Sequence, residues 1–286
     1  MKRVTGTYSA PRPHWVGDGF PARSMFSYNT HGQHLSPFLL LDYAGPYNFA
    51  PSDTPRGVGQ HPHRGFETVT IVYEGEVAHR DSTGAGGTIG PGDVQWMTAA
   101  SGILHEEFHT PEFSKRGGTL DMVQLWVNLP AKEKMTDPKY QEFAPERIPV
   151  VHPEAGVDVK VIAGNVDGTQ GPIVQPATDP LYLDITLAPD RAWTYALPEG
   201  HNAFAYVFEG AVTVGEQDAA RDVARQELAV LGGGEQLHLS AGSEGARLIL
   251  VAGRPLREPV MRHGPFVMNT RQELMQAFVD FQEGKF

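Results

Sequence analysis

The strongest constraint on the fold is a sequence pattern that occurs twice. The stretch TIVYEGEVAHRDSTGAGGTIGPGDVQWM in the first half, and AYVFEGAVTVGEQ followed later by LAVLGGGEQLHL in the second, each give a strand, a Glu-Gly pair, a strand, a glycine-rich or acidic turn and another strand. The pairs Glu74-Gly75 and Glu209-Gly210 lie 135 residues apart, and Gly92-Asp93 and Gly234-Glu235 lie 142 apart, a difference that one change of loop length explains. The pattern predicts an all-β chain with two duplicated β-barrels.

The rest of the chain agrees with many short strands, because its 32 glycines and 23 prolines are scattered rather than clustered. One helix is predicted near the C-terminal end, where Thr270 and Glu273 form a capping box and Leu274, Phe278 and Phe281 form an apolar stripe. The polar segment 129–149 is predicted to link domains at 1–134 and 135–286. The best strand candidates are residues 38–41, 67–73, 123–129, 159–163, 181–187, 203–208 and 247–251.

Composition limits the kinds of partner. A chain of 286 residues fits two domains of ordinary size, and its net charge of −11 with no basic run argues against binding a nucleic-acid backbone. Cysteine is absent, so histidine and carboxylate are the strong metal ligands available, and a reducing location fits. Glycine, proline and charge interrupt the N-terminal stretch, and no apolar run approaches the roughly 20 residues that span a bilayer. We therefore expect a soluble, cytoplasmic protein.

Two pairs of potential ligands have the same spacing. QHPHRGFE carries His61 and His63, and GILHEEFH carries His105 and Glu107. Side chains two residues apart on a strand lie on one face, so two strands can each direct two ligands into one barrel. A lone His-x-His is often incidental, and the second pair is what favours a metal site. Three imidazoles and a carboxylate suit Fe(II), Mn, Ni, Cu or Zn and leave positions open for dioxygen or a chelating substrate.

Longer segments around these pairs resemble the pirins, a branch of the cupin superfamily. The resemblance covers nearly the whole chain and rests on SPFLLLDY, HPHRGFETV, PGDVQWMTAASGILHEE, LDMVQLWVNLP and GPFVMNTRQELMQAFVDFQEGKF. It implies two tandem cupin (jelly-roll) barrels with a few short helices, and one metal, usually iron, in the N-terminal barrel. It also implies that His61, His63, His105 and Glu107 are the metal ligands.

The carboxylate ligand has an alternative. Cupins in general take it from a glutamate shortly after His-x-His, and Glu67 occupies roughly that place with the parity of the histidines. We follow the pirin pattern and choose Glu107, leaving Glu67 to hydrogen-bond a ligand imidazole. Gln124 resembles a pirin residue near the metal. Residues expected to pack the core, or to line an aromatic ligand pocket, are Phe66, Trp96, Met97 and Trp126.

The remaining candidates are given no catalytic role. In the second barrel only His201 and His238 stand near the expected ligand positions, so that barrel is predicted to hold no metal and to be structural or to help form the mouth of the site. TGAGGTIG lacks the lysine of a phosphate loop and is predicted to be a hairpin. The histidines without an informative context are His14, His31, His34, His79, His109 and His152, of which His109 shares the parity of His105.

Two functions follow from the resemblance. Several pirins are described as quercetin 2,3-dioxygenases, which implies an oxidoreductase that binds a flavonol and dioxygen, opens the central ring and releases carbon monoxide, with Glu107 as proton acceptor. Other family members act as regulators, which implies an iron-dependent, redox-sensing protein that contacts a transcription factor or a metabolic enzyme. Sequence favours the enzyme, because the intact ligand set is its most direct feature.

Overall fold

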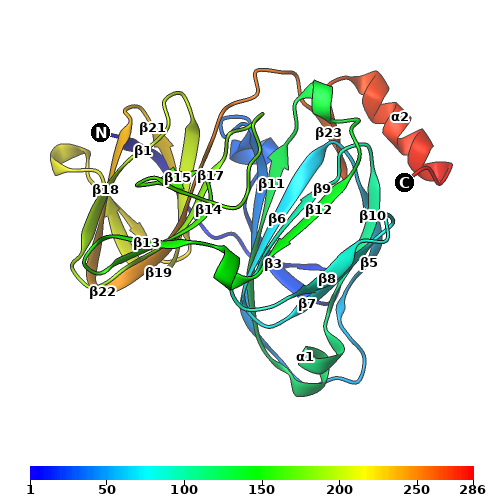
Figure 1. Cartoon of the computed structure of the whole chain (residues 1–286), viewed down its shortest axis with the longest axis horizontal. Helices are drawn as coiled ribbons and strands as arrows, with labels where there is room; N and C mark the ends of the chain where they lie inside the picture. Colours follow the sequence, from blue (N-terminus) through cyan, green and yellow to red (C-terminus); the bar gives the residue numbers. More distant parts are fainter. The chain divides into compact units, whose positions relative to one another are not determined.

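The computed structural model describes residues 1–286. The backbone is mainly β-strand and divides into two compact units (Figure 1). The unit called here the first barrel comprises Arg12–Gly32, Phe38–Pro145 and Leu256–Phe286. The second barrel comprises Met1–Pro11, Gln33–Pro37 and Glu146–Pro255. The prediction of an all-β chain with two barrels in tandem is confirmed.

Two antiparallel sheets form the first barrel. The larger has the strand order β12 (Lys139–Phe143), β9 (Val94–Thr98), β6 (Phe66–Glu74), β11 (Gly118–Asn128), β4 (Phe38–Phe49), β3 (Phe20–Ser27) and β2 (His14–Val16). The smaller has the order β5 (Gly57–His63), β10 (Ile103–His109), β7 (Val77–Asp81) and β8 (Gly86–Ile89). An apolar cluster joins them, because Val77 and Ile89 of the smaller sheet pack with Val72, Met122 and other residues of the larger.

Strand parity decides what faces the interior of this barrel. Every second residue of β10 is buried, namely Ile103, His105, Glu107 and His109. That alternation is typical of a strand with one face on a core. β6, a central strand, is instead buried on both faces from Phe66 to Val72. The first barrel therefore places polar β10 side chains where a purely structural barrel would place apolar ones.

The second barrel is built on one nine-stranded sheet. Its main path is β1 (Arg3–Ser9), β21 (Glu227–Gly232), β19 (Asn202–Val214), β22 (Gln236–Gly253), β17 (Leu181–Leu187), β14 (Val157–Ala163) and β13 (Val150–Glu154). Off this path, β18 (Ala192–Ala196) pairs with β22 and β20 (Arg221–Ala224) pairs with β19. A separate hairpin joins β15 (Asn165–Val166) and β16 (Thr169–Gln170). Long β19 and β22 shift register on either side of Glu209-Gly210, which lies within β19 as a bulge rather than as a turn and lets the strands bend around an apolar interior.

Local sequence signals predicted the positions of several of these elements. All seven strand candidates lie in strands, except that Leu129 falls just beyond β11. The glycine-rich segment 83–90 forms the β7–β8 hairpin, as predicted. The remaining elements are α1 (Pro111–Arg116) and the short helical turns η1 (Tyr28–Gly32), η2 (Ala131–Glu133), η3 (Pro145–Arg147) and η4 (Gln217–Ala219).

Both chain ends correct the predicted division at 134/135. The N-terminal strand β1 pairs with β21 and so belongs to the second barrel. The segment from Leu256 belongs to the first barrel and contains β23 (Met261–His263), β24 (Phe266–Met268) and α2 (Arg271–Gln282). The predicted linker is also largely part of the first barrel, because β12 pairs with β9. The physical reason is strand pairing: each segment joins the sheet that offers it backbone hydrogen bonds, whatever its distance along the chain.

Helix α2 begins as predicted. Thr270 accepts from the Glu273 amide, and the Glu273 carboxylate accepts from the Thr270 amide. Its packing face differs from the predicted stripe, because Leu274 and Ala277 are buried whereas Phe281 is 39% exposed. Leu274 and Ala277 pack against Phe266 and Met268 of β24.

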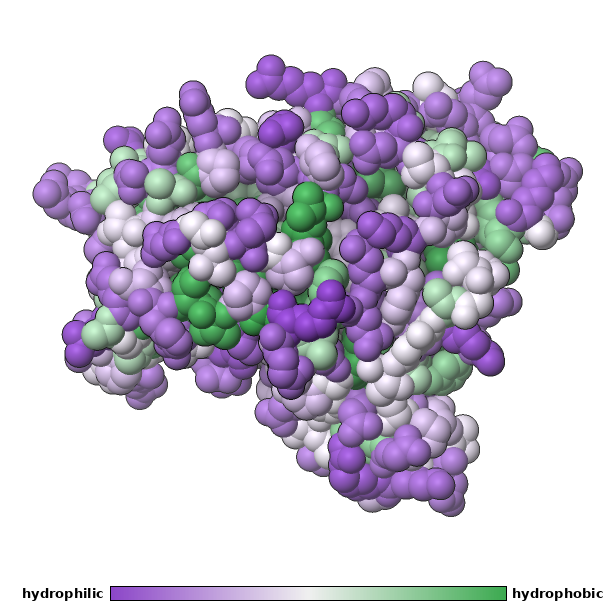
Figure 2. Space-filling view, in the orientation of Figure 1, coloured by the Kyte–Doolittle hydropathy of each residue, from purple (hydrophilic) through white to green (hydrophobic).

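The face in Figure 2 is mainly hydrophilic, with small, separate apolar patches. No helix is long and apolar enough to cross a membrane.

Candidate metal centre

Three histidines converge inside the first barrel. β5 and β10 pair antiparallel, with His61 directly opposite His105, while Pro62 separates His61 from His63. The ring centroids are 4.1 Å apart for His61 and His105, 4.8 Å for His63 and His105, and 4.9 Å for His61 and His63. One nitrogen of each ring lies within 4.8 Å of one nitrogen of each of the others. The spacing argument therefore identified three side chains that meet in space.

These imidazoles are neutral and suited to bind a metal. Burial, followed by the nearby His61 ring, lowers the pKa of His63 to about 3, and burial beside the other rings holds the pKa of His105 far below its usual range. His61 donates its Nδ1 proton to the Gly59 carbonyl at 2.9 Å, which leaves a lone pair on Nε2. Nε2 of His105 is buried without a hydrogen-bond partner. A cation coordinated by these lone pairs would satisfy that nitrogen, so the residues fit a divalent metal.

Glu107 is buried on the same strand. Burial raises its pKa to about 7, and a hydrogen bond from Gln124 acts in the opposite direction. Its carboxylate belongs to a second group, with His79 and His105, whose donor atoms lie within 4.8 Å of one another. His105 is a member of both groups.

Gln124, which resembles a pirin residue near the metal, lies beside Glu107. Its Nε2 donates to Glu107 Oε1 at 3.3 Å and to Thr70 Oγ1 at 3.2 Å. Its Oε1 accepts from the indole Nε1 of Trp126 at 3.2 Å. Because the indole can only donate, this contact fixes which way the amide points and turns its NH₂ group toward the carboxylate.

The aromatic candidates separate into two sets. Phe66 and Trp126 stack with ring centroids 4.3 Å apart, and the His63 ring meets both edge-on at 5.0 and 5.2 Å. They form an aromatic wall behind one imidazole. Trp96 and Met97 are buried in the core, away from these ring contacts.

Glu67 is buried on β6, and its Oε1 accepts from Thr98 Oγ1 at 2.7 Å. Its hydrogen bond to a ligand imidazole stays a prediction. His109 shares the parity of His105 but donates its Nε2 proton to the Gly19 carbonyl at 2.9 Å, and its ring packs against Phe20, Phe49 and Phe113.

His79 is the residue that sequence reasoning missed. It lies on β7 opposite Glu107, is 4% exposed, and its Nδ1 is 3.3 Å from Nδ1 of His105. The signal was present, because Val77, His79 and Asp81 alternate with outward residues after the Glu-Gly turn, as expected for an inward-facing strand.

In the second barrel, His201 and His238 are not members of either group of potential metal ligands. His201 Nε2 lies 3.5 Å from Asp179, and His238 Nδ1 lies 2.9 Å from Thr194 Oγ1. Both groups of potential metal ligands are in the first barrel.

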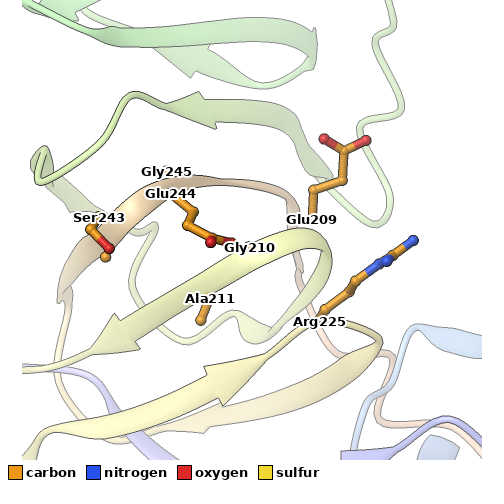
Figure 3. Close-up of a pocket in the computed structure, with 8 residues that line it drawn as sticks. Glu209, Gly210, Ala211, Arg225, Ser243, Glu244 and Gly245 are labelled. Carbon is orange, nitrogen blue, oxygen red and sulfur yellow. The ribbon is translucent and has the colours of Figure 1, made fainter.

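Two hollows differ in what surrounds them. A cavity of about 40 Å³ adjoins Glu107, room for about one or two water molecules. It is lined by Val16, Phe20, Ala22, Asp42, Ala44, Glu107, Met122 and Gln124. A larger, open hollow of about 660 Å³ lies in the second barrel between Glu209, Arg225 and Glu244 (Figure 3). That hollow contains none of the grouped ligands, so size does not mark the candidate site.

Comparisons with known proteins agree with this geometry. The family model described as Pirin matches residues 19–127, and that of the Pirin C-terminal cupin domain matches residues 182–286. A Pseudomonas aeruginosa protein named "Putative quercetin 2,3-dioxygenase PA2418" is 53% identical over 100% of this chain and 99% of its own. A pirin-like protein of Caulobacter vibrioides is 47% identical over 89% of this chain and 88% of its own. The crystal structure of a quercetin 2,3-dioxygenase from Acinetobacter baumannii superposes with a TM-score of 0.95 at 49% identity, covering 100% of this chain and 98% of that one.

Proposed function

This chain belongs to the pirin family of two-barrel cupins, and from that premise we propose that it is a metal-dependent dioxygenase of the quercetin 2,3-dioxygenase type. The observation that carries the proposal is the convergence of three neutral imidazoles, among them His105 with its unpartnered buried Nε2, next to a buried carboxylate. The names of the Pseudomonas and Acinetobacter relatives support the substrate class.

In this proposal one divalent ion is held by His61, His63, His105 and Glu107. The ion we propose is Fe(II), although Mn, Ni, Cu and Zn suit the same donor atoms. When bound, it would supply Lewis acidity toward the 3-hydroxyl and carbonyl oxygens of a flavonol and a route for electrons to dioxygen.

Side chains of the protein accept the proton that the flavonol 3-hydroxyl releases. Glu107, with its pKa raised to about 7, accepts the proton of the flavonol 3-hydroxyl at a carboxylate oxygen. Gln124 holds the other carboxylate oxygen in place, because its own amide is fixed by Trp126. The neutral histidines do not compete for the proton, since burial keeps their pKa values low. Overall, one dioxygen is consumed, the central flavonol ring opens, and carbon monoxide is released.

The test combines metal analysis of anaerobically purified protein with oxygen uptake on a panel of flavonols. We expect about one metal per chain and metal-dependent uptake, with both lost in His61→Ala. The matched control is His152→Ala, which removes an exposed histidine of the second barrel and should change neither. Robust turnover by metal-free protein would overturn the proposal.

A second candidate is a redox-sensing binding protein that contacts a transcription factor or a metabolic enzyme. It is favoured by the net charge of −11 and by a second barrel whose interior is filled with apolar side chains. Capture of a partner by the ferric but not the ferrous protein would support it, and identical capture by both would contradict it.

A further inference from the structure

The His79 side chain is buried between Tyr140, His105 and Asp81. One ring face stacks on Tyr140, with centroids 5.2 Å apart and an interplanar angle of 18°. The His105 ring lies 5.1 Å away, and the two Nδ1 atoms are 3.3 Å apart. A side chain held this firmly beside a candidate ligand can control how that ligand is oriented.

The contact between the two Nδ1 atoms fixes a tautomer. One nitrogen must donate and the other must accept. If His79 donated, the proton of neutral His105 would sit on Nε2, where it would be a buried donor with no acceptor. If His105 donates through Nδ1, its Nε2 carries a lone pair that no hydrogen-bond donor occupies. The second arrangement makes His105 a competent ligand and moves the buried donor without a hydrogen-bond partner to His79 Nε2, which faces the Asp81 carboxylate.

Asp81 completes the arrangement from the opposite side. When His79 accepts at Nδ1, its proton is on Nε2, which lies 3.6 Å from Asp81 Oδ2. That distance is longer than a hydrogen bond, and the contact is an electrostatic one between buried groups. The carboxylate is itself fixed, because its Oδ1 accepts from the Thr83 amide at 2.8 Å, the Thr83 hydroxyl at 2.6 Å and the Ala85 amide at 3.3 Å.

We propose that His79, held by Asp81, is a positioning residue that sets the tautomer and ring orientation of the metal ligand His105. The proposal rests on the proposed function, since it requires that His105 binds an ion. The proposed site then includes, besides the ligand His105 on β10, the neighbouring strand β7 and the turn that follows β7. Groups that orient a metal-bound histidine typically change metal affinity about 10- to 100-fold when they are removed.

Two substitutions separate a hydrogen-bonding role from a packing role. His79→Phe keeps a ring for Tyr140 to stack on and removes both nitrogens. His79→Asn removes the ring and keeps an acceptor close to the position of Nδ1. The matched control is His109→Phe, which removes another buried histidine from the first barrel without touching His105.

The measurement is Co(II) affinity of the full-length apoprotein by chelator competition, together with the Co(II) absorption spectrum. We expect His79→Phe to bind about 10- to 100-fold more weakly with an altered spectrum, and His79→Asn and His109→Phe to stay within about threefold of the unsubstituted protein. Unchanged binding by His79→Phe, equal losses in the Phe and Asn variants, or an equal loss in His109→Phe would overturn the inference. Absence of Co(II) binding by the unsubstituted protein would instead defeat the proposed function.

A measurement on the unsubstituted protein keeps the test independent of variant folding. Long-range ¹H–¹⁵N spectra of the Zn(II)-loaded, ¹⁵N-histidine protein report which ring nitrogen carries the proton. We expect His105 to be protonated at Nδ1 and His79 at Nε2. A proton on Nδ1 of His79, or two zinc ions per chain with His79 as a ligand, would contradict the assignment.

Discussion

The two barrels share a Glu-Gly pair with a left-handed glycine and differ in what fills them. Glu74-Gly75 turns the chain between β6 and β7, and Glu209-Gly210 forms a bulge inside β19, with glycine φ angles of +88° and +66°. Behind the second pair the interior is a continuous apolar cluster that includes Val159, Leu183 and Leu248. Behind the first, the strands direct imidazoles, a carboxylate and an amide inward. Burying polar groups costs free energy unless they find partners, so the first barrel exchanges part of its apolar core for a reactive site.

The largest expected effect is a difference in metal affinity between two histidine-to-alanine variants, one in each barrel. His63→Ala removes one of four proposed ligands and should lower metal affinity by roughly 100-fold or more, judged from four-ligand zinc sites in peptides, which contribute about 10–16 kcal/mol in total. His201→Ala should leave metal content unchanged, because His201 lies in neither ligand group. Metal analysis after dialysis is the measurement. Equal metal loss in both variants would remove the distinction between the barrels.

A substitution in the apolar interior of the second barrel should lower stability and leave metal affinity unchanged. Leu248→Ala creates a cavity at a fully buried position of the second barrel and should reduce the free energy of unfolding by about 3 kcal/mol. Metal affinity should stay the same, since no ligand touches this cluster. Urea unfolding and metal titration measure the two quantities. A loss of stability below about 1 kcal/mol would mean that the interior repacks and is not the rigid core described here.

The first barrel should also show a pH dependence. Metal binding needs the Glu107 carboxylate, and its pKa is raised to about 7 by burial, so metal affinity should rise about tenfold per pH unit below 7 and level off above it. In the apoprotein the sign is reversed: the raised pKa favours the protonated folded state, so this contribution to stability is lost as the pH rises through 7. Glu107→Gln should bind metal more weakly and without this slope. A slope that persists in the variant would assign the proton to another group.

The smallest effect concerns the helix that returns to the first barrel. Arg64, the residue after His63, donates to Asp280 of α2 at 2.8 Å and to the Ser101 carbonyl, and its guanidinium lies 4.3 Å from the centre of the Phe286 ring. Asp280→Asn should cost about 1–2 kcal/mol, because Arg64 keeps its other contacts. Hydrogen exchange should increase in α2 and leave the second barrel unchanged. Equal increases in both barrels would indicate that α2 stabilises the whole chain.

Sequence reasoning succeeded where a property depends on neighbours along the chain. The capping box of α2, the glycine-rich hairpin and the parity of His105 and Glu107 follow from a few adjacent residues. Gln124 was singled out by a family resemblance rather than by local pattern, and its contact with Glu107 was found only in the structure. His79 was missed because its meaning depends on the pairing of β7 with β10, which no short stretch of sequence reveals.

The amino-acid sequence by itself determined the strand-rich character, the two repeats and the kinds of donor atom available for a metal. Tertiary structure decided which strands pair. A register shift between β5 and β10 sets His61 opposite His105 and Glu107 opposite Val58, and the chain ends join the barrels most distant from them in sequence. The physical reason is that backbone hydrogen bonds between strands are non-local: the chain's own pattern says which face of a strand is inward, and only packing of the whole sheet selects its neighbour.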